Sequence, residues 1–367
     1  MSRTPYTIAL VQTGCRESAE ENLLAHLELA ERAASLGADV ICLQELFIGP
    51  YFCQQEDARL FDLAEAVPGP TTEAFGKLAK KTGTAIVVSL FEKRAPGLYH
   101  NTAAVMGREG KILGLYRKMH IPDDPAFFEK FYFTPGDLGF LAVDTHVGRI
   151  GVCVCWDQWY PEAARLTALK GAEVIFYPTA IGWHPQEKDL LGDEQRSAWQ
   201  LVQRGHAVAN GCYIAAANRI GLERPLAESH NANGAGIEFW GTSFVAGPMG
   251  DLVAQAPTDE ETILLAQVDP QRMEDESGAS ALFLGGKIGL KDMGSCLLIH
   301  TLAHFSSRSF LPEKSRPHFP QTHGRIFNAC SRYSIFFMYV SWLLKKSRSL
   351  CQRHRTRYEP EDNGPYL

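Results

Sequence analysis

Short, predominantly apolar segments alternate with helix-forming segments along the first 268 residues, and this alternation constrains the fold more than any other feature. Runs such as 38–43 (ADVICL) and 172–177 (AEVIFY) lack a polar face, which is typical of strands buried on both sides of a sheet. The predicted strands lie at 6–12, 38–43, 84–91, 149–155, 172–177, 212–217 and 262–268. The predicted helices lie at 18–36, 71–82, 161–170 and 194–209. Strands that alternate with helices in this way predict an α/β protein.

Two predicted hairpins modify that class. Residues 102–106 and 111–116 flank the turn GREG, and residues 242–246 and 251–255 flank GPMG. Hairpins pair strands in antiparallel fashion, so we expect mixed sheets. The pattern fits one doubly wound sheet and two stacked sheets equally well.

Charge divides the chain near Asp275. Residues 1–275 contain 23 Lys and Arg against 36 Asp and Glu, a balance of −13, whereas residues 276–367 contain 13 against 6, a balance of +7. The second part is rich in Ser, Pro and basic residues and has no clear period, which is typical of irregular or disordered chain. We therefore expect a domain at 5–275 and an atypical, poorly ordered basic tail at 276–367.

Composition also limits which binding partners and which cellular compartment we expect for this chain. The net charge of −6 argues against nucleic acid as the main partner. The longest apolar run, 335–344, is about half the ~20 residues that cross a bilayer, so we expect no membrane span. Nine cysteines without framework-like spacing, and an N-terminus unlike a signal peptide, predict a reducing, cytoplasmic setting.

The strongest chemical signal is Cys155, in CVCWDQWYPEAARL. A predicted strand ends there, and a helix with Pro161 near its start follows after a short turn. Backbone N–H groups and the positive helix end favour a thiolate and a developing oxyanion at such a place. Cys155 shares a predicted strand face with Cys153 and lies nearer the strand end. The alternatives are two buried core cysteines or a metal site, and no further ligands complete a metal set.

Three other charged residues follow apolar strands or lie among aromatic residues. Glu45 follows VICLQ and is a candidate general base, and Lys118 follows 111–116 and is a candidate oxyanion stabiliser. Glu129 lies in AFFEKFYF, where a buried carboxylate needs a counter-ion such as Lys118. His120 is more typical of a packed or supporting histidine. Glu45, Lys118 and Glu129 each alone also fit an exposed position. Together with the Cys155 thiol, they supply a nucleophile, a base and a cationic stabiliser for acyl transfer through a thioester.

These segments together resemble the carbon–nitrogen hydrolase (nitrilase) superfamily, which has a Glu–Lys–Cys triad. Its motifs match at 44–47 (QELF), 117–120 (RKMH) and 155–157 (CWD) followed by Pro161-Glu162, and Glu129 matches a second glutamate of the family. The resemblance implies a four-layer αββα sandwich that forms homodimers or larger homo-oligomers. It also implies a small-molecule substrate and no metal or organic cofactor.

Within the superfamily, IPDDPAFFEKFYFTPGD, YPTAIGWHP and the helix at 194–211 are similar to the branch that hydrolyses N-carbamoylputrescine in polyamine biosynthesis. This implies that Glu45 deprotonates Cys155, that Lys118 holds the oxyanion, and that the products are putrescine, ammonia and CO2. The ammonium end of such a substrate needs acidic or aromatic neighbours. The expected substrate contacts are Tyr51, Asp123, Asp124, Trp156, Asp157, Trp183 and Glu187.

Three alternatives stay open. An ω-amidase or a β-ureidopropionase-like carbamoylase has the same chemistry, and a pocket lined by arginine would favour its carboxylate-bearing substrates. The second alternative is a non-catalytic form impaired by its tail. The resemblance stops near Asp275, where ESGASALFLGG replaces the usual Arg/Trp/Pro-containing stretch. The third, a nucleic-acid binder, rests only on the basic tail and lacks stacking motifs.

Overall fold

The computed structural model describes residues 4–184, 186–226 and 235–283. The predicted tail beyond residue 283, with its apolar run at 335–344, lies outside these ranges. Within them, helix α6 (Pro270–Phe283) continues the chain beyond the domain boundary expected at Asp275. No helix in the described ranges combines the length and apolar character that crossing a lipid bilayer requires.

Two six-stranded mixed sheets form the centre of the described chain. The first contains, in spatial order, β15 (Thr262–Val268), β1 (Tyr6–Gln12), β2 (Val40–Cys42), β3 (Ala85–Ala95), β4 (Leu98–Met106) and β5 (Ile112–Arg117). The second contains β14 (Leu252–Gln255), β13 (Phe244–Ala246), β10 (Tyr213–Ala217), β8 (Val174–Pro178), β7 (Arg149–Val152) and β6 (Leu141–Asp144). A smaller sheet contains β11 (Ile220–Glu223), β12 (Ile237–Trp240) and β9 (Gly182–Trp183). Each large sheet has three parallel strands at its centre and antiparallel strands at its edges.

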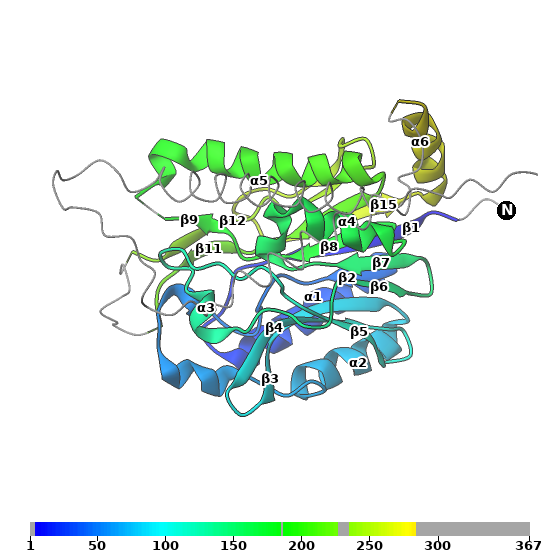
Figure 1. Ribbon diagram of the computed structural model, residues 1–367. Helices are drawn as coiled ribbons and strands as arrows, with labels where there is room; N and C mark the ends of the chain where they lie inside the picture. Colours follow the sequence, from blue (N-terminus) through cyan, green and yellow to red (C-terminus); the bar gives the residue numbers. More distant parts are fainter. Residues whose placement is uncertain (1–3, 185, 227–234, 284–367) are drawn as a thin grey trace, which may run out of the picture. The chain divides into compact units, whose positions relative to one another are not determined.

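Helices cover the outer faces of both large sheets, giving the expected αββα layers (Figure 1). One side carries α1 (Ala19–Ser35) and α2 (Pro70–Thr82), and the other carries α4 (Pro161–Leu169) and α5 (Lys188–Asn210). The short helices are α3 (Glu129–Tyr132) and the 3-10 turns η1 (Phe52–Gln54), η2 (Ala58–Leu63) and η3 (Cys155–Trp159). Ser18 and Glu21 form the capping box that starts α1.

Strand β1 shows why the sheets stack. Ile8 and Leu10 belong to a buried apolar cluster that includes Val152 of the opposite sheet. Ala9 and Val11 point the other way and pack in the cluster beneath α1 and α2. A strand without a polar face therefore lies between a second sheet and a helix layer, which distinguishes two stacked sheets from one doubly wound sheet.

The structure corrects two sequence-based predictions. The strand expected at 149–155 ends at Val152, so Cys155 begins the turn η3 and does not lie on the strand. Cys153 and Cys155 do not share a face, because the Cys153 thiol contacts Thr167 of α4 whereas the Cys155 thiol contacts the Ala180 carbonyl. Asp157 accepts a hydrogen bond from the Val154 N–H (2.9 Å) and holds the chain in a turn.

Candidate active site

Glu45 leaves the first sheet just beyond β2, where the chain turns sharply. Its N–H donates to the carbonyl of Thr179 just after β8 (3.3 Å), so the backbone of Glu45 joins the ends of the two sheets. The next residue, Leu46, has a φ of +47°, in the left-handed region that a residue with a Cβ rarely adopts. The turn directs the Glu45 side chain into the protein, where it is fully buried.

Lys118 lies between two buried carboxylates. It follows β5, and its Nζ donates to Glu45 Oε1 (2.8 Å) and to Glu129 Oε2 (2.6 Å). The three side chains are 0%, 0% and 1% exposed, so their charges interact in an environment of low polarity. Gly136 donates to the carbonyl of Lys118 (2.9 Å), and a Cβ at this glycine would lie 1.9 Å from the carbonyl oxygen of Arg117.

The protonation states of this cluster follow from its burial and its neighbours. Burial alone would lower the pKa of Lys118, but the carboxylates of Glu129 and Glu45 outweigh that effect and raise the pKa well above its usual value. Lys118 therefore stays an ammonium ion at neutral pH. Burial raises the pKa of Glu129 to about 7, against the lowering effect of Lys118.

Cys155 is 4% exposed and interacts electrostatically with Glu45, Lys118 and Glu129. Its φ of +40° is a left-handed conformation that costs of order 1–3 kcal/mol, and residues in such conformations cluster at functional sites. Burial, and next the charge of Glu45, raise the pKa of the thiol well above its usual value. The resting sulfur therefore carries its proton, and a base would have to remove that proton before this sulfur could act as a nucleophile.

One oxygen of Glu45 is free to act as that base. Oε1 accepts hydrogen bonds from Lys118 and from Asn101 Nδ2 (2.7 Å). The buried Oε2 has no hydrogen-bond partner among the described residues. A carboxylate held by one oxygen, with the other unpaired, has the geometry of a preorganised general base.

His120 and Asp157 stabilise the turn that carries Cys155. Asp157 is fully buried, and its Oδ1 accepts from the backbone N–H of His120 (3.1 Å) and contacts the ring Nδ1 (2.7 Å). Its Oδ2 accepts from Tyr116 (2.8 Å) and from Val154. Both oxygens are therefore engaged within the protein, in contrast to the substrate contact expected of Asp157. His120 also stacks on Tyr160, with ring centroids 3.7 Å apart.

The remaining predicted substrate contacts lie in two groups. Tyr51 is buried and donates to Glu129 Oε1 (2.7 Å), and its ring packs on Phe127, next to the loop that carries the exposed Asp123 and Asp124. Trp156 is half-buried beside Trp159. The other group lies at the start of α5, where Trp183 is packed in the core and Glu187 is exposed. Trp183 donates to the Gly192 carbonyl (2.9 Å), so its polar atom is already engaged.

Sequence reasoning missed Asn101 and Arg219, which contact Glu45, and Glu223, which pairs with Arg219. Arg219 is fully buried and contacts the carbonyl of Glu45. It follows the predicted strand at 212–217 closely, as Glu45 follows the one at 38–43, so the same signal would have found it. Asn101 lies inside β4 and leaves no comparable signal, since its hydrogen bond to Glu45 spans 56 residues.

The chain is similar to known carbon–nitrogen hydrolases. The sequence profile described as "Carbon-nitrogen hydrolase" matches residues 7–275. N-carbamoylputrescine amidase of Solanum lycopersicum is 45% identical over 271 residues, which is 74% of this chain and 88% of that one. Citrullinase of Francisella tularensis is 36% identical over 277 residues, 75% of this chain and 93% of that one. The crystal structure of a carbon–nitrogen hydrolase from Helicobacter pylori G27 superposes with a TM-score of 0.74 at 44% identity, covering 80% of this chain and 99% of that one.

Proposed function

The chain belongs to the carbon–nitrogen hydrolase family, and from that premise we propose that it hydrolyses N-carbamoylputrescine to putrescine, ammonia and CO2. The observation that carries the proposal is the buried cluster of Glu45, Lys118, Glu129 and Cys155. The similarity to plant N-carbamoylputrescine amidases, at 42–45% identity, supports the choice of substrate.

The reaction begins with proton transfer from Cys155 to Glu45. The thiolate attacks the ureido carbonyl, and the ammonium group of Lys118 with a backbone N–H of the Cys155–Trp156 turn stabilises the oxyanion. Glu45 returns its proton to the departing nitrogen, leaving a carbonyl bound to sulfur. Water, deprotonated by Glu45 or Glu129, then cleaves that bond and restores the thiol. The released carbamic acid loses CO2, so one water is consumed in each cycle.

Recognition of the substrate's ammonium end falls to the loop that precedes α3. Asp123 and Asp124 are adjacent, and the partial burial of the Asp124 carboxyl together with the charge of Asp123 raises the pKa of Asp124. Lys130 approaches Asp123 at 3.8 Å and balances one of the two charges. The remaining negative charge suits an alkylammonium ion. Arg219 is paired with Glu223 and offers no free cation to a substrate carboxylate.

A comparison of three ureides tests the proposal. We expect kcat/KM for N-carbamoylputrescine to exceed that for N-carbamoyl-β-alanine and for citrulline by about 100-fold or more, because both competitors carry a carboxylate. Cys155→Ala lowers kcat by about 10⁴-fold or more, whereas Cys153→Ala, the matched control, stays within a few-fold. Faster turnover of either carboxylate-bearing ureide would reject the substrate, and full activity of Cys155→Ala would reject the mechanism.

We also propose that the enzyme is a cytoplasmic homo-oligomer. All six cysteines in the described part of the chain are free thiols, which fits a reducing compartment. Leu190, Leu201 and Val208 are 82%, 65% and 43% exposed on α5. At 3.6 residues per turn they lie within about 20° of one another. That exposed apolar stripe, opposite the buried Trp199, supports burial against a second copy.

A further inference from the structure

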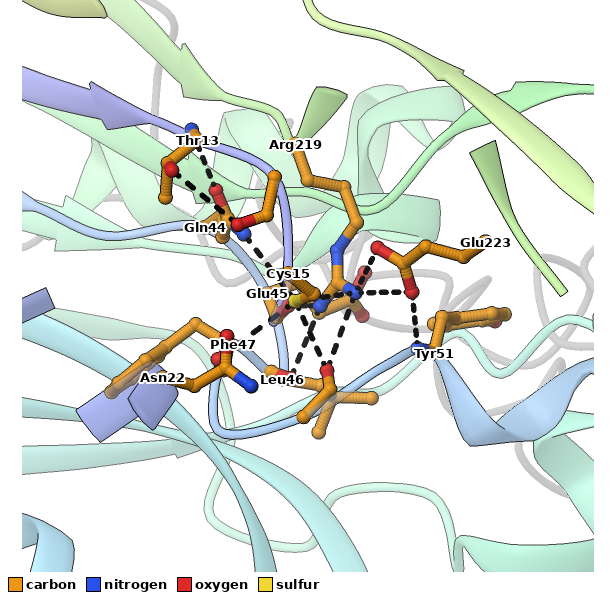
Figure 2. A network of polar contacts seen from close by, with 12 residues as sticks. Thr13, Cys15, Asn22, Gln44, Glu45, Leu46, Phe47, Tyr51, Arg219 and Glu223 are labelled. Carbon is orange, nitrogen blue, oxygen red and sulfur yellow. Dashed lines mark hydrogen bonds and ion pairs between the residues drawn. The ribbon is translucent and has the colours of Figure 1, made fainter. Parts of the chain in front are cut away.

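Arg219 is a fully buried arginine whose guanidinium contacts the chain on both sides of the Glu45 turn. Its Nη2 donates to the carbonyl of Glu45 (2.5 Å) and to that of Leu46 (3.1 Å), and its Nη1 donates to both oxygens of Glu223 (2.8 and 3.0 Å). Figure 2 shows the guanidinium between the Glu45–Leu46 backbone and the Glu223 carboxylate. Residue 219 lies 174 positions from residue 45 in the chain.

These two carbonyls need a donor because of the turn that they form. Leu46 has a left-handed φ of +47°, which a side chain with a Cβ disfavours. Buried carbonyl groups without partners are costly. The planar guanidinium bonds both carbonyls at once and so stabilises the one backbone conformation that directs the Glu45 side chain to Lys118.

Glu223 connects the same arginine to the second carboxylate. Its Oε2 accepts a hydrogen bond from the backbone N–H of Tyr51 (2.6 Å), and the Tyr51 hydroxyl donates to Glu129 Oε1 (2.7 Å). The Arg219–Glu223 ion pair therefore positions both carboxylates that flank Lys118. Arg219 acts on the backbone of Glu45, and Glu223 acts on Glu129 through Tyr51.

We propose that the Arg219–Glu223 pair is the positioning unit of this active site, fixing the Glu45 turn and Tyr51 so that both carboxylates meet Lys118. The proposal rests on the proposed catalytic roles of Glu45 and Cys155. A buried ion pair is weak evidence for stability, since apolar pairs of similar volume stabilise equally well. The contacts of this pair with three backbone carbonyls, those of Glu45, Leu46 and Gly49, and with one backbone N–H assign it a geometric role instead.

The test replaces both members of the pair. Arg219→Met with Glu223→Gln removes the two charges together, so no buried charge is left unpaired and the fold is retained, as urea denaturation checks. The matched control is Arg117→Met with Glu92→Gln, because that pair is also buried (side chains 8% and 4% exposed) but its guanidinium bonds only side-chain oxygens. Arg219→Lys is a third variant, which keeps the positive charge but loses the planar guanidinium that bonds both carbonyls.

Two rates are measured, turnover of N-carbamoylputrescine and alkylation of Cys155 by iodoacetamide, followed by peptide mass. We expect the double variant to lower kcat by about 100-fold with KM within about threefold, as expected for a misplaced catalytic group. In the double variant, we expect alkylation of Cys155 to slow by about tenfold or more. The control pair stays within about threefold of the wild type on both rates. Arg219→Lys resembles the double variant on both.

The decisive comparison repeats the alkylation in a Glu45→Gln background. If Arg219 acts through Glu45, replacing Arg219 in the Glu45→Gln background slows alkylation by less than about threefold further, because the positioned base is already absent. An undiminished effect in that background, or equal losses from the control pair, would overturn the proposal. Alkylation needs no ureide, so a wrong substrate assignment would show as absent turnover with the alkylation pattern intact.

Discussion

Among single residues, Lys118 stands out in the described structure as a buried lysine with two buried carboxylates as partners. It is completely buried and donates to two carboxylates that are themselves completely or almost completely buried. Taking such charges out of water is costly, and their mutual attraction compensates only while all partners are present. The same arrangement that keeps Lys118 cationic, as its proposed oxyanion role requires, therefore makes the cluster sensitive to loss of any one member.

Lys118→Met leaves Glu45 and Glu129 without their counter-ion. We expect the free energy of unfolding at pH 8 to fall by about 3–5 kcal/mol, the usual cost of breaking a buried pair. Lys130→Met, at an exposed lysine beside Asp123, is the control and changes it by about 0.5 kcal/mol or less. Urea denaturation of both variants and the wild type measures these differences.

The penalty of Lys118→Met should also depend on pH. Burial already raises the pKa of Glu129 to about 7, and loss of Lys118 raises it further. A carboxyl whose folded pKa is raised contributes stability below its unfolded pKa, and that stability is lost as pH rises through the folded value. The penalty is therefore smaller at pH 5.5 than at pH 8, and equal penalties would contradict this charge assignment.

At the scale of elements, helix α1 is fixed to the first sheet partly by a buried histidine. His26 contacts the carbonyl of Asn22 through Nδ1 (2.7 Å), and its ring lies 4.6 Å from that of Phe47. Phe47 follows the Glu45–Leu46 turn directly. The packing of α1 is thereby coupled to the segment that carries the proposed base.

His26 gives this element a defined response to acid. Burial lowers its pKa to about 4, from 6.5. A group with a lowered folded pKa contributes stability above its unfolded pKa, and that stability is lost as pH falls from 6.5 towards 4. We expect the wild type to lose about 3 kcal/mol more than His26→Leu between pH 7 and pH 4, as urea denaturation measures. Parallel pH dependence in the two proteins would show that His26 does not carry this effect.

At the scale of the whole described domain, the αββα layers leave three large apolar side chains exposed along one face of α5. The buried side of α5 holds Trp199 against the second sheet, while Leu190, Leu201 and Val208 are exposed on its opposite side. Exposed apolar residues are common singly, but three aligned along one helix form a stripe that burial against another copy would remove from water.

Sedimentation velocity tests that arrangement. We expect the full chain to sediment as a dimer or larger species, and Leu201→Glu to shift it to the monomer, because a carboxylate within an apolar interface is costly. Leu24→Glu, at a 59% exposed position on α1, is the matched control and leaves the assembly unchanged. A chain ending at Phe283 measures the effect of the tail on assembly. An unchanged sedimentation coefficient for Leu201→Glu would show that the interface lies elsewhere.

The sequence by itself determined the elements and the chemical groups. Apolar runs without a polar face predicted strands such as β1 and β8, because local pattern fixes which faces are buried. The motifs around Glu45, Lys118 and Cys155 predicted the kind of reaction. The small sheet of β9, β11 and β12 and the edge strand β6 were missed, because each is short and lies outside the longer apolar runs, unlike the equally short β2 within 38–43.

Only the tertiary structure decided which groups meet and in what state. Asn101 and Arg219 hold Glu45 across 56 and 174 residues of chain, and no local pattern encodes contacts between such distant segments. Asp157 was expected to contact the substrate, yet the fold surrounds both of its oxygens with hydrogen-bond partners from the protein. The raised pKa of the Cys155 thiol likewise depends on burial, which exists only once the two sheets have closed over the site.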